Sequence, residues 1–504
     1  LRGDKSRVIA VIGDASLTGG MAFEALNQAG DLDKDIIVIL NDNEMSISPN
    51  VGAISSYLSR KATGRTYFYF KRRFQLALKS LKGLPSAENI FLLARRLEDA
   101  FKSFFTPGML FEAFKFDYIG PIDGHRLDQI IETLENVRQI RGPILVHVLT
   151  TKGKGYKPAE DNPVHYHGVT ALNGAQEPAP AGRPARTYTQ VFGRTMCRLA
   201  HREERLVAIT AAMPEGTGLH EFTHKFPDRT FDVGIAEQHA VALAAGLAVE
   251  GFIPVVAIYS TFMQRAYDQI IHDVCLPGLH VVLALDRGGI VGEDGPTHQG
   301  LFDLSYLRTG PKMVVIAPRD ENILQHALNT AVGLDGPVAL RYPRGRGSGV
   351  DLEPKLRTLP LGRGECLREG KDILLLPAGH MVAPALEAAE ELAKIGLKAA
   401  VVDPVFIKPL DSQMILDWAQ TCGRVVTIEE NVLAGGFGSG VGEMLAAAGL
   451  TIPLKMIGIP DKFVEHGSQQ VLRSVYGLDS AGITATVKSW INGVVPRFRQ
   501  AKAG

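Results

Sequence analysis

Short apolar runs alternate with helix-like segments along almost the whole chain, and this pattern most constrains the fold. Near the start, an apolar run at 8–12 is followed by a helical pattern at 21–27 and a second apolar run at 36–40. Such alternation is typical of parallel sheets whose strands are buried on both faces. We therefore predict an α/β protein in which mainly parallel sheets are flanked by helices.

The length of the chain divides this pattern into blocks. A chain of 504 residues is long enough for about three domains, and the Pro- and Ala-rich stretch at 175–185 is typical of a linker. We predict three domains, each built on one sheet, at residues 1–185, 186–358 and 359–504. Further strands are expected at 254–259, 281–285, 313–317, 373–376, 399–402 and 425–428.

Composition excludes several classes of protein. Lys plus Arg and Asp plus Glu number 54 each, so the formal net charge is zero and the whole surface is not suited to nucleic acid. The four cysteines are scattered, which argues against a disulfide framework or a zinc site and fits a reducing compartment. No apolar run is long enough to predict a membrane-spanning helix. We expect no nucleic acid and no membrane as partners.

One segment departs from this charge balance. Residues 60–102 carry 11 Lys or Arg residues against three acidic ones, a local net charge of +8, and aromatic residues cluster at 67–70. A basic, aromatic segment is compatible with binding to nucleic acid or anionic lipid. We favour a cover over an anionic ligand, or a solvated helix, because the chain shows no other basic asymmetry.

Polar residues follow the first two expected strands. Asp14 follows the first apolar run after a single glycine, and Asn43 follows the second run, one strand–helix–strand unit later. Parallel sheets bind ligands at the carboxyl ends of their strands. A carboxylate, an amide oxygen and a main-chain carbonyl suit Mg²⁺ held against a diphosphate, whose oxygens backbone N–H groups can approach. On these residues alone, a tight turn and a helix N-cap remain the simpler interpretation.

Longer motifs identify a family. The sequence GDASLTGGMAFEA at 13–25, followed by NDNEMSIS at 41–48, closely resembles the thiamine diphosphate signature of the 1-deoxy-D-xylulose-5-phosphate synthase family of transketolase-like enzymes. The resemblance implies a diphosphate-binding, a pyrimidine-binding and a C-terminal domain. It continues in the same order through motifs at 120–125, 152–156, 232–239, 259–269, 286–289, 294–300 and 341–345.

This resemblance implies an activity and its cofactors. The family uses thiamine diphosphate and Mg²⁺ to decarboxylate pyruvate and to transfer the two-carbon unit to D-glyceraldehyde 3-phosphate, which supplies isoprenoid, thiamine and pyridoxal synthesis. A homodimer is implied, located in the cytoplasm of a bacterium, or in a plastid if the source is a plant. Three alternatives stay open: transketolase, a 2-oxo acid dehydrogenase component, and an inactive remnant that serves as a binding subunit.

The resemblance also assigns the cofactor site. Asp14, Asn43 and the main chain of Met45 are the metal ligands, whereas Ala15 and Ser16 contact the diphosphate. The family normally has glycine where this chain has Ala15, so a methyl group could crowd the diphosphate or exclude a left-handed backbone. We therefore expect weakened cofactor binding.

Further residues are assigned to the reaction centre. Glu237 sets the tautomer of the pyrimidine, Phe262 stacks on its ring, and Tyr156 and His167 line the cofactor. The ordinary alternatives are an acid at a helix N-terminus for Glu237 and a core aromatic for Phe262. Glu237, His167 and His298 are the catalytic candidates.

The acceptor substrate carries a phosphate, which arginine can grip with two parallel hydrogen bonds. The resemblance gives this role to Arg287 and Arg344, although a surface ion pair is the ordinary alternative for each. The remaining residues of the acceptor pocket are Tyr259, Arg265, Asp294 and His298.

Two further features bear on these expectations. The family's chain starts well before Leu1, so we expect an incomplete first domain and low activity from this chain alone. The glycine-rich run at 435–440 lacks the spacing of a nucleotide-binding loop, and we expect it to allow close packing of a helix on a strand.

Overall fold

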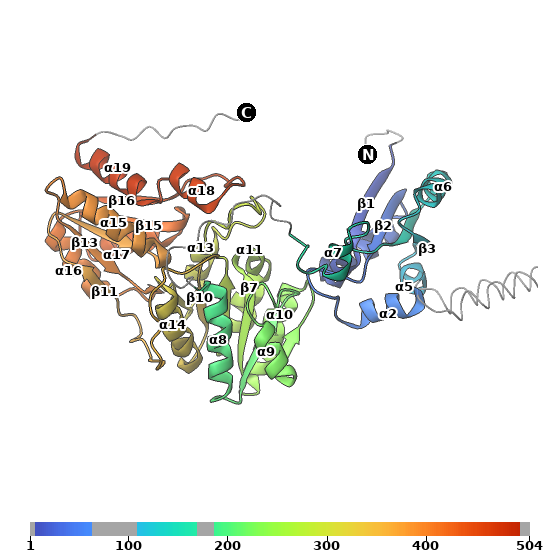
Figure 1. The fold of residues 1–504 in the computed structure, drawn as a ribbon, viewed down its shortest axis with the longest axis horizontal. Helices are drawn as coiled ribbons and strands as arrows, with labels where there is room; N and C mark the ends of the chain where they lie inside the picture. Colours follow the sequence, from blue (N-terminus) through green and yellow to red (C-terminus); the bar gives the residue numbers. More distant parts are fainter. Residues whose placement is uncertain (1–5, 63–107, 169–185, 494–504) are drawn as a thin grey trace, which may run out of the picture. The chain divides into compact units, whose positions relative to one another are not determined.

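The computed structural model describes residues 6–62, 108–168 and 186–493, so the basic segment at 60–102 lies almost entirely outside the described residues. The chain forms two compact units. The first comprises Leu1–Gly174 with Val233–Ala236, and the second comprises Ala175–Asp232 with Glu237–Gly504. Mainly parallel sheets flanked by helices form both units, which confirms the predicted fold class (Figure 1).

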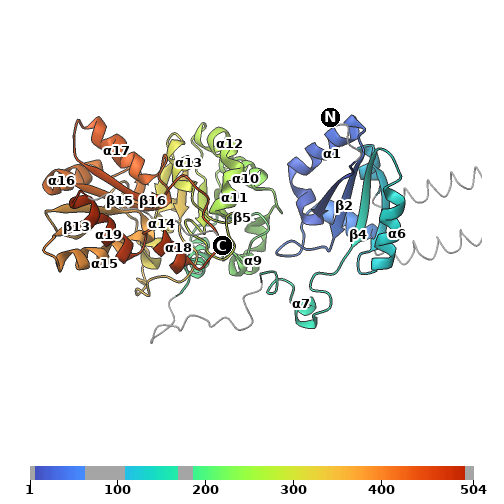
Figure 2. The ribbon, with the colours of Figure 1, turned by 90° about the horizontal axis from the view of Figure 1, so that it is seen from above.

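The first unit is built on a parallel sheet with the strand order β1-β2-β4-β3, and α1 and α6 lie on opposite sides of it (Figure 2). Successive residues of a strand point to opposite faces. Val38 and Leu40 of β2 therefore share one core with Leu26 of α1, whereas Ile37 shares another core with Val137 of α6. The elements are β1 (Val8–Gly13), η1 (Asp14–Thr18), α1 (Gly20–Leu32), β2 (Ile36–Asp42), α2 (Ala53–Ala62), α5 (Gly108–Ala113), β3 (Asp117–Asp123), α6 (Leu127–Val137), β4 (Pro143–Leu149) and α7 (Lys157–Asp161).

The larger sheet of the second unit has seven strands in the order β14-β9-β10-β8-β7-β5-β6. Phe192 of α8, Phe222 of α9 and Leu324 of α14 are buried in one core with apolar side chains of its strands. The elements contributed by the second block are α8 (Tyr188–Ala200), β5 (Leu206–Thr210), α9 (His220–Lys225), η2 (Pro227–Arg229), β6 (Thr230–Asp232), α10 (Glu237–Val249), β7 (Ile253–Tyr259), α11 (Ser260–Met263), η3 (Gln264–Ala266), α12 (Tyr267–Gln269), η4 (Ile270–Cys275), β8 (Val282–Asp286), α13 (Asp303–Thr309), β9 (Val314–Ile316), α14 (Glu321–Gly333) and β10 (Val338–Arg341).

The smaller sheet has the strand order β11-β13-β12-β15-β16, with β11 antiparallel to β13. The glycine-rich run packs α17 onto this sheet as expected, because a Cβ on Gly438 would lie 2.5 Å from Thr427 Oγ1 of β15. The elements of the third block are β11 (Glu365–Arg368), β12 (Ile373–Pro377), η5 (Gly379–Met381), α15 (Val382–Ala393), β13 (Ala399–Asp403), β14 (Phe406–Lys408), α16 (Ser412–Cys422), β15 (Val425–Val432), α17 (Phe437–Ala447), β16 (Leu454–Ile459), α18 (Gln469–Val475) and α19 (Ser480–Ile491).

One strand of the third block belongs to the sheet of the second block. β14 belongs to the third block by sequence, but it pairs antiparallel with β9 at the edge of the seven-stranded sheet. Its first residue, Phe406, is fully buried in the core of that sheet. The two blocks therefore share one sheet in addition to the chain that connects them.

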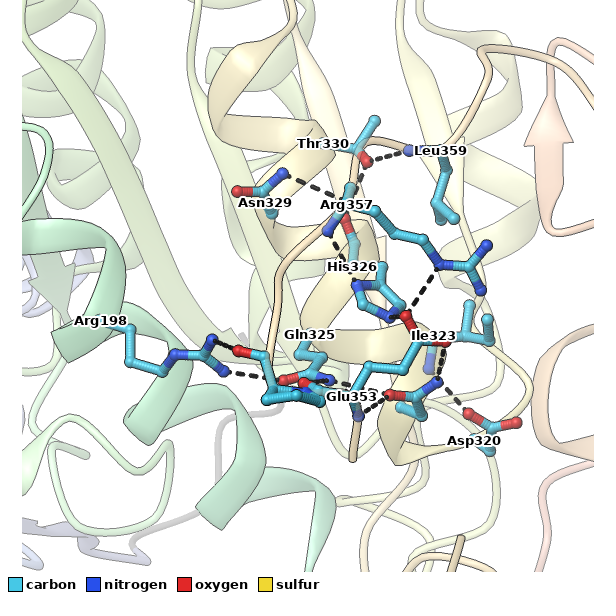
Figure 3. Close-up of polar contacts among 12 residues, drawn as sticks. Arg198, Asp320, Ile323, Gln325, His326, Asn329, Thr330, Glu353, Arg357 and Leu359 are labelled. Atoms are coloured by element: carbon cyan, nitrogen blue, oxygen red, sulfur yellow. Dashed lines mark hydrogen bonds and ion pairs between the residues drawn. The ribbon is translucent and has the colours of Figure 1, made fainter. Parts of the chain in front are cut away.

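The connecting chain itself runs back along α14 and is held there by hydrogen bonds (Figure 3). The backbone N–H of Leu359 donates to Thr330 Oγ1 over 2.8 Å, and that of Arg357 donates to His326 Nδ1 over 3.2 Å. These contacts fix the start of the third block against a helix of the second. Across the described ranges, the helices are all too short or too polar to cross a membrane.

Candidate functional site

The residues singled out in the sequence fall into two groups, one in each unit. In the first unit, Asp14 follows β1 and is only 5% exposed, and Asn50 Nδ2 donates to its Oδ2 over 2.6 Å. Burial, together with the nearby charge of Asp42, raises the pKa of Asp14 from 3.8 to about 7. Backbone N–H groups of Ala15 and Asn43 bond to the same carboxylate and oppose this rise. The site thus brings Asn43 beside Asp14 and favours a bound cation, which would offset the repulsion between the carboxylates.

The carboxylate of Asp42 contacts a buried histidine that the sequence analysis missed. His147 of β4 is fully buried, and its Nε2 lies 2.9 Å from Asp42 Oδ2, while the hydroxyl of Tyr118 lies 2.7 Å from its Nδ1. Burial alone would raise the pKa of Asp42, but the hydrogen bond and charge of His147, together with hydrogen bonds from Asp14 and the backbone N–H of Glu44, lower it. A histidine inside the otherwise apolar strand 143–149 was the available signal.

The turn after β2 uses the side chain of Asn43. Asn43 Oδ1 accepts a hydrogen bond from the backbone N–H of Met45 over 3.0 Å, which is the geometry of an Asx turn. Within the described residues, no three His, Cys, Asp or Glu side chains gather into a metal-binding group. A cation beside Asp14 would therefore draw on carboxylate, amide and main-chain oxygens, which are the ligand types that Mg²⁺ accepts.

Ala15 and Ser16 occupy the short helix η1. Ser16 is exposed, Ala15 is 8% exposed, and the carbonyl of Ala15 accepts a hydrogen bond from Thr18 Oγ1 over 2.7 Å. Ala15 is not among the described residues with positive φ. Ala15 therefore has a helical backbone, and the weakened cofactor binding expected from its methyl group stays a prediction.

A lysine connects the remaining candidates of the first unit. Lys152 Nζ donates to the carbonyl of Ser46 and lies 2.8 Å from Nδ1 of His167, whose side chain is exposed. Burial lowers the pKa of Lys152, and the charge of Asp14 opposes this effect. Lys152 therefore lies within electrostatic reach of Asp14 and links His167 to it. Tyr156 is 50% exposed, and its ring stands edge-on to Tyr166.

In the second unit, Glu237 begins α10 and is 2% exposed. Its Oε2 pairs with Nη1 of Arg265, a residue that the sequence analysis had placed in the acceptor pocket. Burial raises the pKa of Glu237, although its own backbone N–H and the charge of Arg265 oppose the rise. A carboxyl group with a raised pKa can share a proton with a neighbouring base near neutral pH.

Tyr259, Phe262 and His298 form a row of rings in the second unit. Phe262 of α11 lies with its ring centroid 6.0 Å from that of Tyr259 and 5.3 Å from that of His298, which stands edge-on to it. Thr297 Oγ1 lies 2.9 Å from His298 Nδ1. Burial lowers the pKa of His298, opposed by the charge of Asp294, so the imidazole is largely neutral at neutral pH.

Two arginines converge at the end of this row. The guanidinium carbon of Arg287 lies 3.7 Å from the ring centroid of Tyr259. Its Nη1 is 3.6 Å from Asp294 Oδ2, and Nη1 of Arg344 lies 3.0 Å from the same oxygen. Two guanidinium groups therefore meet at one carboxylate, while Glu293 Oε2 lies 3.9 Å from Arg344 Nη1. Paired guanidinium groups are suited to binding an anionic group. We call Tyr259, Phe262, Arg287, Asp294, His298 and Arg344 the arginine–aromatic cluster.

Comparison with protein families assigns consecutive parts of the chain. The family model described as 1-deoxy-D-xylulose-5-phosphate synthase matches residues 1–150. The transketolase pyrimidine-binding domain matches residues 185–348, and the transketolase C-terminal domain matches residues 362–483. The arginine–aromatic cluster and Glu237 lie within the range of the second match, and Asp14 lies within that of the first.

Curated relatives are similar over nearly the whole chain. A 1-deoxy-D-xylulose-5-phosphate synthase of Geobacter sulfurreducens is 57% identical over 493 residues, which cover 97% of this chain and 77% of the relative. The synthase of Desulfotalea psychrophila is 57% identical over 483 residues, covering 95% of this chain and 74% of the relative.

Two solved structures resemble the fold. A split-gene transketolase, described as an inactive β4 tetramer, has a TM-score of 0.55 and 32% identity, and the match covers 61% of this chain and 99% of that one. The transketolase of Campylobacter jejuni has a TM-score of 0.53 and 19% identity over 96% of this chain and 77% of that one. The second likeness bears on the fold alone.

Proposed function

This chain belongs to the 1-deoxy-D-xylulose-5-phosphate synthase family, and we propose that it forms 1-deoxy-D-xylulose 5-phosphate and CO₂ from pyruvate and D-glyceraldehyde 3-phosphate. The family is thiamine diphosphate-dependent and of the transketolase type. The observation that carries the proposal is the arginine–aromatic cluster, which joins ring faces for a heterocyclic cofactor to two guanidinium groups for a phosphate.

The residues of the first unit fit Mg²⁺ and a diphosphate. Asp14 is buried and close enough to Asp42 for their charges to interact, so a divalent cation would relieve the repulsion that raises the pKa of Asp14. In this proposal Asp14, Asn43 and the carbonyl of Met45 hold the metal, and the η1 residues Ala15 and Ser16 approach the diphosphate. The metal would screen the charge of the diphosphate and fix its orientation.

The residues of the second unit fit the pyrimidine and the acceptor. Thiamine diphosphate supplies the nucleophilic carbon and the electron sink when it is bound. Glu237 would share a proton with a ring nitrogen of the pyrimidine, and Phe262 would support the ring face. Arg287 and Arg344 would hold the phosphate of the acceptor, with Tyr259 and Asp294 fixing the two guanidinium groups.

Three further residues complete this assignment. His298 is held largely neutral by burial, so it can accept a proton from a hydroxyl group of the substrate. In the first unit, His167 would act beside Lys152 and Tyr156 at the cofactor's reactive end. Arg265 would hold the carboxylate of Glu237 in place, in addition to its expected role in the acceptor pocket.

We propose the same three-domain division as the sequence analysis, at 1–185, 186–358 and 359–504. Three separate sheets support it, although β14 crosses the second boundary. A cytoplasmic homodimer is proposed on the family resemblance alone.

Product analysis tests the proposal. The protein is incubated with Mg²⁺, thiamine diphosphate, pyruvate and D-glyceraldehyde 3-phosphate, and the products are identified by mass spectrometry. We expect 1-deoxy-D-xylulose 5-phosphate together with CO₂, both lost in Asp14→Asn and retained in the surface variant Asp128→Asn. Release of CO₂ without the sugar phosphate would contradict the acceptor assignment. Binding of thiamine diphosphate with no CO₂ release would instead favour an inactive binding subunit.

A further inference from the structure

A fully buried ion pair lies next to the arginine–aromatic cluster. Arg341 ends β10 and Asp303 begins α13, and Arg341 Nε donates to Asp303 Oδ1 over 3.2 Å and to Oδ2 over 3.0 Å. The two side chains are 1% and 0% exposed. Buried pairs of this kind add little net stability compared with apolar packing. The role of this ion pair is therefore to be found in the chain segments that the two side chains hold in place.

The first such segment carries the aromatic residues. Ser260 Oγ donates to Asp303 Oδ2 over 2.9 Å, and Ser260 is only 2% exposed. Ser260 directly follows Tyr259 and begins the short helix α11, which contains Phe262. One hydrogen bond therefore ties the start of the aromatic segment to the ion pair.

The second segment carries Arg287. Gly288 lies so close to the ion pair that a Cβ on it would be 2.5 Å from Arg341 Nε. Gly300 packs between the two segments, because a Cβ there would lie 2.3 Å from the carbonyl oxygen of Arg287 and 2.7 Å from Ser260 Oγ. The two segments that carry the rings and the guanidinium thus meet at one buried charged pair.

The third block completes the support. Arg341 Nη2 donates to the carbonyl of Glu430, at the carboxyl end of β15, over 2.7 Å. The carboxylate of Glu430 is fully buried and pairs with Arg473 over 2.6 Å and with His380 over 2.8 Å. The guanidinium group of Arg341 is therefore held on two sides, by Asp303 of its own block and by the carbonyl of Glu430 of the third block.

We propose that Arg341 and Asp303 are positioning residues that set the spacing between the aromatic segment and Arg287. This inference rests on the proposed function, because that spacing is the one between the pyrimidine ring and the phosphate of the acceptor. Asp303 acts on Tyr259 and Phe262 through Ser260, and Arg341 acts on Arg287 through Gly288. Neither charged residue needs to touch a ligand.

Ser260→Ala removes the link to the aromatic segment and leaves the ion pair intact. We expect the Kd for thiamine diphosphate, titrated calorimetrically with Mg²⁺, to rise roughly five- to tenfold, which is less than the full effect of a lost hydrogen bond to a charged group because Ser260 acts on the cofactor only through its neighbours. Thr195→Val is the matched control, because it removes a buried hydroxyl that bonds only within α8. The control should lower the unfolding temperature as much as Ser260→Ala without changing this Kd.

Asp303→Asn then tests whether the link runs through the ion pair. If it does, Ser260→Ala should weaken cofactor binding less in the Asp303→Asn background than in the wild type, because the two changes break one connection. Fully additive effects on the Kd would overturn the proposal. Circular dichroism in the far ultraviolet establishes that each variant is folded.

Gly288→Ala tests the second link, with inorganic phosphate as the probe and ³¹P line broadening as the readout. We expect weaker phosphate binding and a higher KM for D-glyceraldehyde 3-phosphate, with cofactor affinity changed less than in Ser260→Ala. The positioning proposal alone would be overturned by one result: the wild-type protein binds both ligands, and the Kd of Ser260→Ala for thiamine diphosphate is within twofold of the wild-type Kd. Wild-type protein that binds neither ligand would overturn the proposed function and this inference with it.

Discussion

The guanidinium of Arg287 lies over the ring of Tyr259, with its central carbon 3.7 Å from the ring centroid. Arg287 has a backbone φ of 62°, which is uncommon for a residue with a side chain. Backbone conformation and ring contact together hold the guanidinium toward Asp294, and a strained backbone at such a position is a common property of ligand-binding residues.

Replacement of Arg287 by alanine tests its role as a phosphate ligand. We expect the KM for D-glyceraldehyde 3-phosphate to rise roughly ten- to a hundredfold, because a charge-assisted hydrogen bond contributes about 1.5–3 kcal/mol. Arg287→Lys should recover only part of this loss, since lysine lacks the planar fork. Arg205→Ala, which removes an exposed arginine paired with Glu203, is the control. An unchanged KM in Arg287→Ala would contradict the assignment.

Glu237→Gln keeps the size of the side chain and removes its acid. We expect kcat to fall by roughly 10²–10⁴, the usual contribution of a positioned acid or base. The unfolding temperature should change little, because burial already raises the pKa of this carboxyl group and disfavours its charge. The exposed Glu221→Gln, whose partner is Lys225, should leave kcat unaltered. Equal kcat values for the two variants would show that Glu237 does not act in the reaction.

Ala15→Gly tests whether the methyl group of Ala15 crowds the diphosphate. Ala15 is buried and helical, so glycine is not needed for its backbone conformation. We expect thiamine diphosphate with Mg²⁺ to bind roughly tenfold more tightly to the variant, the gain typical of relieved overpacking. Ala29→Gly in α1 controls for the loss of helix stability, and calorimetric titration is the measurement. Identical affinities for wild type and Ala15→Gly would sink this explanation.

His326 makes stability dependent on pH. Burial lowers its pKa below 6.5, although the charge of Glu353 opposes this effect, and His326 Nδ1 accepts the backbone N–H of Arg357 (Figure 3). The unfolded chain therefore binds the proton more readily than the folded one. Its contribution to stability is fully present above pH 6.5 and is lost as the pH falls through the lower folded pKa.

Urea unfolding between pH 7.5 and 5 measures this effect. His326→Gln should flatten the decline in the free energy of unfolding below pH 6.5, whereas the exposed His201→Gln should retain it. A decline of equal slope in wild type and His326→Gln would show that other groups are responsible.

The strands that sequence reasoning found share one property. The runs at 36–40, 281–285 and 425–428 correspond to β2, β8 and β15, which are mostly buried and therefore mostly apolar over these residues. β14 was missed because its partner β9 lies about 90 positions earlier in the chain. Pairings of that kind depend on the packing of whole sheets, which local patterns do not encode.

The same distinction holds for the candidate site. The types of ligand at Asp14 and Asn43 could be inferred from their places after neighbouring strands. The contact between Asp42 and His147, which are 105 positions apart, requires that β4 lie beside β2 in the sheet. The pairs of Arg265 with Glu237 and of Arg341 with Asp303 likewise join residues that no motif connects. The sequence pattern shows which residues carry chemistry, whereas the fold determines which of them pair.

The pairing of β14 with the sheet of the second block has a consequence for how this protein can be divided. A chain cut after residue 358 would expose the edge of β9 and leave Phe406 without the core that encloses it. Exposed strand edges promote aggregation. Expression trials aimed at the pyrimidine-binding half alone should therefore yield insoluble material, whereas a span from 186 to the end of α19 should behave as a single cooperative body.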